Sequence, residues 1–157
     1  MILWLKRLGL PLLVAFLVIQ LFQPAKTNPP VDPQREMHAI VAADHPAVAV
    51  IQRSCTDCHS HRTVWPWYSH VAPVSWLVVS DVNQGRKALN FSEWSGYPPE
   101  QKRKHLSEIC KEVSEGEMPG LSYTLMHKNS KLSADDVITI CRWAQSPAQS
   151  AVSTERE

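Results

Sequence analysis

A pair of cysteines three positions apart, with a histidine directly after the second, constrains this 157-residue chain more than any other feature. The run is Cys55-Thr56-Asp57-Cys58-His59. On one helical turn, residues three and four apart lie on the same face, so both thiols and the imidazole would point the same way. The C-x-x-C-H pattern is typical of covalent haem attachment. It predicts one haem c bonded to Cys55 and Cys58, with His59 as the proximal iron ligand.

Three other chemistries share part of this pattern. A thioredoxin-like redox pair follows a strand, whereas residues 44–53 read as a helix with Asp44 as its N-cap. A zinc site needs two more closely spaced ligands; His61 is near, but Cys110 and Cys141 lie in separate segments. A disulfide within C-x-x-C has strained geometry. The motif therefore favours haem over these three alternatives.

A protein with this motif needs a sixth iron ligand or an open distal face. Met118 is the preferred ligand, because it lies in a loop between two glycines and Pro119 restricts the backbone around it. His127 is the nitrogen alternative, and an open site is the third possibility. His105 belongs to a charged helix and is expected to face water.

The segment after the motif is rich in aromatic residues. Aromatic rings cover a flat apolar macrocycle efficiently, and indole and phenol groups can donate hydrogen bonds to its propionates. We therefore expect haem contacts here, in preference to an aromatic core unrelated to the cofactor. The predicted pocket residues are Trp65, Trp67, Tyr68 and Trp76 and, later in the chain, Tyr123.

The amino terminus has its own pattern. Lys6 and Arg7 precede an uncharged run over residues 8–22, which predicts an export signal or a signal anchor. The residues before Lys26 make a poor cleavage site, which favours an uncleaved anchor. We therefore expect residues 1–23 to form a transmembrane helix, with the rest of the chain across the membrane.

The rest of the chain divides into three parts. Four prolines make residues 24–43 a predicted stiff linker, residues 44–146 are the predicted haem domain, and residues 147–157 are a predicted flexible tail. The formal net charge of +1 removes the electrostatic case for nucleic-acid binding. No glycine-rich phosphate loop is present, which argues against a nucleotide-binding enzyme.

Helical periodicity runs through the predicted haem domain, and nothing reads as a long alternating strand. Apolar stripes predict helices over residues 74–86, 98–115 and 133–145. Cys110 and Cys141 fall on the inward stripes of the last two. In an oxidising compartment they could form a disulfide, and the alternative is a pair of buried free thiols.

Further short motifs follow C-x-x-C-H along the chain, namely Trp65-Pro66-Trp67-Tyr68-Ser69, Ala72-Pro73-Val74-Ser75-Trp76, Gly85-Arg86, Asn90-Phe91-Ser92 with Trp94, and Met118-Pro119 with Tyr123 and His127. Over about residues 48–143 the chain resembles the bacterial haem-binding domain proteins related to cytochrome c. The resemblance implies a single covalent haem c, a mostly helical fold and export to the periplasm. It implies no particular reaction. One departure is His61, where the family pattern has asparagine.

These observations predict an all-α, cytochrome c-like domain around one covalent haem, preceded by an N-terminal membrane helix. The expected function is electron transfer at the bacterial inner membrane, with the haem domain in the periplasm and redox proteins as partners. The alternative is a haem-based sensor or peroxidase-like protein with an open or labile distal site. An electron carrier is preferred to an enzyme, because no paired distal acid–base groups are evident.

Overall fold

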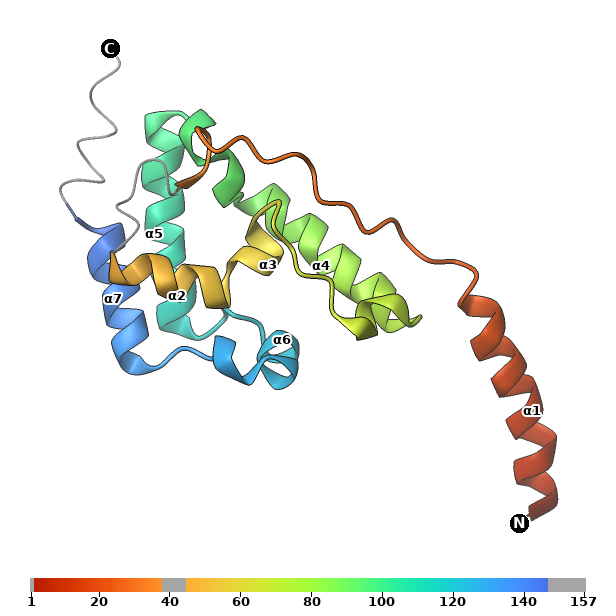
Figure 1. The fold of residues 1–157 in the computed structure, drawn as a ribbon. Helices are drawn as coiled ribbons and strands as arrows, with labels where there is room; N and C mark the ends of the chain where they lie inside the picture. Colours follow the sequence, from red (N-terminus) through yellow and green to blue (C-terminus); the bar gives the residue numbers. More distant parts are fainter. Residues whose placement is uncertain (1, 38–44, 147–157) are drawn as a thin grey trace.

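The computed structural model describes residues 2–37 and 45–146. Every regular element in these two ranges is a helix and none is a strand, which confirms the all-helical prediction (Figure 1). The α-helices are α1 (Ile2–Ile19), α2 (Pro46–Ser54), α3 (Thr56–His59), α4 (Val74–Ala88), α5 (Pro99–Glu115), α6 (Leu121–Met126) and α7 (Ala134–Ala144). The short 3-10 helices η2 (Trp67–His70), η3 (Phe91–Gly96) and η4 (Lys128–Ser130) lie between them.

The prediction of an N-terminal membrane helix is wrong. The apolar run does form helix α1, but no helix in the described part of the chain is long and apolar enough to cross a membrane. The 18 residues of α1 reach roughly 27 Å at ~1.5 Å per residue, less than a hydrocarbon core of ~30 Å. Lys6 and Arg7 fall within this length and shorten its apolar part further.

The helices of the domain begin and end where local signals place them. The proline pair before residue 100 opens α5, and Gly116 ends it with a φ of 75°, a left-handed conformation that suits glycine. Ser133 and Asp136 form a capping box at the start of α7. The N-cap of α2 is His45, whose ring accepts a hydrogen bond from the backbone; the predicted cap, Asp44, lies outside the described residues.

Helices α2, α5 and α7 pack together and bury most of the core. The rings of Trp94 and Trp143 lie 6.4 Å apart in this core, and Ile51 of α2 is fully buried beside them. A disulfide between Cys110 and Cys141 joins α5 to α7, which decides between the two alternatives left open for these thiols. Helix α3 packs against both α2 and α4, and so lies between these three helices and α4.

The predicted linker is described up to residue 37, and that part lies along the domain (Figure 1). We call residues 20–37 the strap. Arg62 holds it through an ion pair with the buried Glu36, with Nε 2.7 Å from Oε1. Met37 is 1% exposed and belongs to the main core cluster. The end of the strap is therefore packed into the domain, while most of residues 21–35 stay exposed.

Candidate functional site

The C-x-x-C-H motif forms the short helix α3 directly after α2. Cys55 is the residue between the two helices, and its backbone N–H bonds to the carbonyl of Ile51. Within α3, the amide of His59 bonds to the carbonyl of Cys55 at 2.9 Å, which closes one helical turn. Cys55 and Cys58 are both free thiols. The motif therefore holds two thiols and an imidazole close together on one helical turn.

His59 is partly buried, and one of its ring nitrogens faces a backbone carbonyl. Its Nδ1 lies 3.2 Å from the carbonyl oxygen of Leu89, at the end of α4. Burial lowers the pKa of the imidazole, and hydrogen bonds to backbone offset this only in part. The ring is therefore neutral at pH 7, with its proton on Nδ1 and its lone pair on Nε2. A histidine oriented through Nδ1 in this way offers Nε2 to a metal.

The two thiols are poorly suited to thiol–disulfide exchange. Burial, with the nearby Cys58 adding to it, raises the pKa of Cys55 to about 12. Burial and the charges of Asp57 and Asp81 raise the pKa of Cys58 to about 11. Redox-active cysteines instead have lowered pKa values. No group of three or more His, Cys, Asp or Glu side chains within the described residues is placed to hold a metal ion.

Two cavities meet the motif. The first, which we call the His59 cavity, has a volume of about 400 Å³ and includes both Cys55 and His59 in its lining. Its other walls come from the end of α4, from one face of α5 and from the loop after α5, where Met118 lies. The second, the Cys58 cavity, has a volume of about 390 Å³ and lies among α3, α4 and α6. A group bonded to both thiols must reach both cavities.

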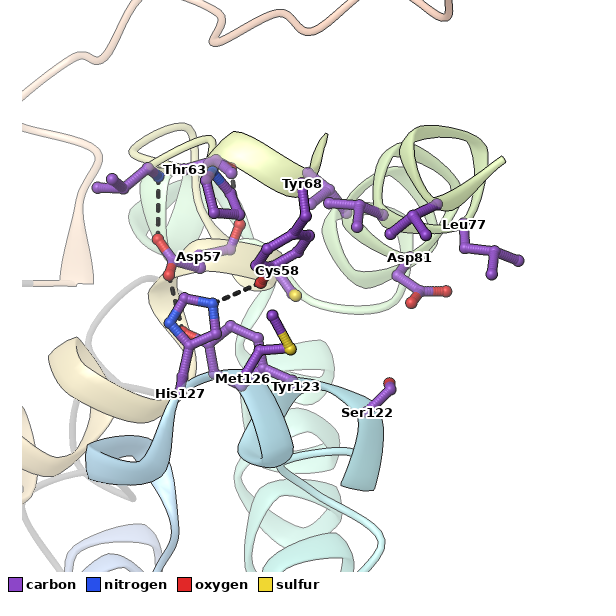
Figure 2. A pocket seen from close by; sticks show the side chains of 15 residues that line it. Asp57, Cys58, Thr63, Tyr68, Leu77, Asp81, Ser122, Tyr123, Met126 and His127 are labelled. Carbon is purple, nitrogen blue, oxygen red and sulfur yellow. Dashed lines mark hydrogen bonds between the residues drawn. The ribbon is translucent and has the colours of Figure 1, made fainter. Parts of the chain in front are cut away.

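The Cys58 cavity has mainly apolar side chains along α4, with Asp81 among them, and is polar at its other end. Figure 2 shows the Cys58 sulfur pointing from α3 toward Met126 of α6. At the polar end, the Tyr123 hydroxyl donates to Asp57 at 2.7 Å, and the Tyr68 hydroxyl lies 2.6 Å from His127 Nε2. Burial and the Asp57 carboxylate raise the pKa of Tyr123, so the phenol stays protonated as the donor. The first bond fastens α6 to the motif helix, and the second joins η2 to the end of α6.

The structure brings together only some of the predicted pocket residues. Tyr68 and Tyr123 line the Cys58 cavity, as the sequence predicts for a pocket position. Trp65, Trp67 and Trp76 line neither of the two cavities. Trp67 is 74% exposed, and the Trp76 indole donates to the carbonyl of Phe22 in the strap.

The two candidates for the sixth iron ligand are in different places. Met118 lines the His59 cavity, as a distal ligand would require, and is 45% exposed. His127 lines the Cys58 cavity, where its Nε2 already has the Tyr68 hydroxyl as a partner. The structure therefore puts Met118, and not His127, in the same cavity as His59.

Sequence reasoning missed two contributors to the His59 cavity. His105 is 6% exposed and lines this cavity, so the prediction that it faces water is wrong. The signal was available, because His105 precedes Ile109 by four residues and so shares its inward helical face. The carbonyl of Leu89 could not be found in this way, since every residue carries one.

The chemistry of these groups fits a haem. Two free thiols on one helical turn can bond to its vinyl groups, a neutral imidazole can bind its iron, and the walls of both cavities are mainly apolar. The model of the haem-binding domain family matches residues 14–146 of the chain. No curated protein and no solved structure matches it.

Proposed function

The chain belongs to the haem-binding domain family, and on this premise we propose that it carries one haem bonded covalently to Cys55 and Cys58. The observation that carries the proposal is the placement of two free thiols and a neutral imidazole on one turn, facing cavities with apolar walls. His59 would bind the iron through Nε2, because Nδ1 is engaged by the carbonyl of Leu89.

We further propose that the protein transfers electrons. A bound haem supplies a one-electron redox centre. The protein's own residues hold the proposed iron ligand in one orientation, and the side chains of Val74, Leu77 and Val82 would give the macrocycle apolar contacts along α4. A fixed ligand would keep the iron geometry constant between oxidation states, which favours electron exchange.

An oxidising compartment suits this chain. The disulfide between Cys110 and Cys141 is of the kind that persists in exported proteins and is rare in the cytosol. We therefore propose that the domain acts in the bacterial periplasm and exchanges electrons there with redox proteins.

The sixth ligand stays a prediction. Met118 is supported by its place in the His59 cavity, and His127 is disfavoured because Tyr68 occupies its Nε2. A thioether ligand opposite a histidine raises the potential relative to two nitrogen ligands. Replacing Met118 by alanine should then lower the potential and open the iron to external ligands, whereas His127→Ala should do neither.

The test begins with protein expressed together with a haem-attachment system. Mass measurement under denaturing conditions should find one haem on the wild type and none on a variant with both Cys55→Ala and Cys58→Ala. Absorption spectra of the ferrous protein should not change on addition of carbon monoxide. A rapid change would support the sensor or peroxidase-like alternative, in which the distal site is open. A wild-type protein without covalent haem would refute the proposal.

A further inference from the structure

Helix α3 depends on outside groups to complete its hydrogen bonds. It has four residues, so its last carbonyl groups have no partner within the helix. The Ser60 hydroxyl donates to the carbonyl of Thr56 at 2.7 Å, and the Thr63 hydroxyl donates to that of Asp57 at 2.6 Å. The carbonyl of Ser60, which directly follows the proposed iron ligand, accepts from Arg86 Nε at 2.7 Å.

Arg86 joins this helix end to the strap. On the motif side it also donates to the Thr63 hydroxyl at 2.7 Å, and on the strap side to the Thr27 carbonyl and the Asn28 side chain, each at 2.8 Å. Asn28 in turn donates to the Thr63 carbonyl at 2.8 Å. A planar guanidinium with five N–H groups can serve acceptors in two segments at once, which a lysine ammonium cannot match.

The end of α4 touches the motif on both sides of Arg86. One residue earlier, Gly85 packs against the carbonyl of Cys58, so closely that an added Cβ would lie 2.7 Å from the oxygen. Three residues later, the carbonyl of Leu89 faces His59 Nδ1 at 3.2 Å. The bond from Arg86 to the motif lies between these two contacts along the chain. This hydrogen bond therefore fixes the position of α3 relative to the Leu89 carbonyl, which orients the His59 ring.

We propose that Arg86 is a positioning residue for His59, and that Asn28 of the strap completes the hydrogen bonds of the Arg86 guanidinium. The inference rests on the proposed function, because it concerns the orientation of the iron ligand. The partner of Nδ1 sets the basicity of a metal-bound imidazole, and this basicity contributes to the potential of the iron. Loosening Arg86 would weaken the contact with Leu89, make the imidazole a poorer donor to ferric iron and raise the potential.

The test uses two variants that leave the net charge unchanged, Arg86→Lys and Asn28→Ala, in the full haem-loaded chain. Outer partners of metal-bound histidines change metal affinity by about 10–100-fold. A tenfold change in the preference for ferric over ferrous iron equals about 59 mV for one electron. We expect Arg86→Lys to raise the potential by about this amount and Asn28→Ala by less. Lys87→Arg and Asn83→Ala, at exposed positions of α4, are the matched controls and should leave it unchanged.

Further measurements separate positioning from stability and from haem attachment. Ser133→Ala removes the cap of α7 and should lower the unfolding midpoint without changing the potential. If Arg86→Lys and Asn28→Ala both keep the wild-type potential with full haem content, Arg86 only stabilises the fold and the inference is overturned. If Arg86→Lys does not accumulate, Asn28→Ala decides alone. Wild-type protein without covalent haem would refute the proposed function, and the positioning role with it.

Discussion

Replacing Gly85 by alanine tests how closely α4 packs on the motif helix. The added Cβ would lie 2.7 Å from the carbonyl oxygen of Cys58 and 3.2 Å from its Cβ, so the two helices would have to move apart. Crowding of this kind costs ~1–3 kcal/mol, whereas glycine to alanine within a helix gains ~1 kcal/mol in propensity. The obstructing atom belongs to the backbone and cannot rotate away. We therefore take the upper part of the cost and expect a net loss of about 1–2 kcal/mol.

The assay is urea unfolding of the haem-loaded protein followed by far-ultraviolet circular dichroism. A lower midpoint with an unchanged slope would report lost stability. Gly9→Ala is the matched control, since Gly9 is also helical but has no atom within 4 Å of an added Cβ. Its midpoint should lie at or slightly above that of the wild type, because only helix propensity changes there. A midpoint for Gly85→Ala at or above the wild-type value would mean that only helix propensity changed, and would refute the close packing.

Three further predictions concern stability. Burial alone would raise the pKa of the Asp136 carboxyl. The hydrogen bonds from Arg53 and from the helix cap outweigh it and hold that pKa at about 2, below its ordinary 3.8. Stability from this group is present above about pH 4 and lost as the pH falls through 2, so thermal unfolding of Arg53→Ala should depend less on pH in that window. Reducing the disulfide between Cys110 and Cys141, which are 31 residues apart, should cost about 3.5 kcal/mol on the chain-entropy model. A loss below ~1 kcal/mol in denaturant titrations would contradict that model here. Trp67→Ala should change the free energy of unfolding by less than ~0.5 kcal/mol, because the indole is 74% exposed. Reduced haem retention in this variant would show instead that the ring covers the cofactor.

The parts of the fold that the sequence predicts correctly are those set by neighbouring residues. Helix α5 follows from its apolar stripe and opening prolines, and α7 from the reciprocal bonds of Ser133 and Asp136. The N-terminal segment shows the limit of such signals, since hydropathy predicts the helix α1 correctly but overstates the distance it can span. The strap shows another limit. Its prolines predict an extended chain, but its path depends on single pairs such as Glu36 with Arg62, which no local pattern reveals.

The site divides in the same way. The motif predicts which side chains can bond to a haem, because spacing within one turn determines their direction. It does not predict where Trp65 and Trp67 point, since the segment around them has no long period from which an inward face could be read. Trp76 does lie in a segment with a helical stripe, but its indole bonds to the Phe22 carbonyl of the strap. The proposed control of the iron potential depends on two backbone carbonyls. The Ser60 carbonyl accepts a hydrogen bond from Arg86, and the Leu89 carbonyl faces His59. An acceptor that every residue possesses leaves no mark in the sequence, so the orientation of the ligand could only come from the structure.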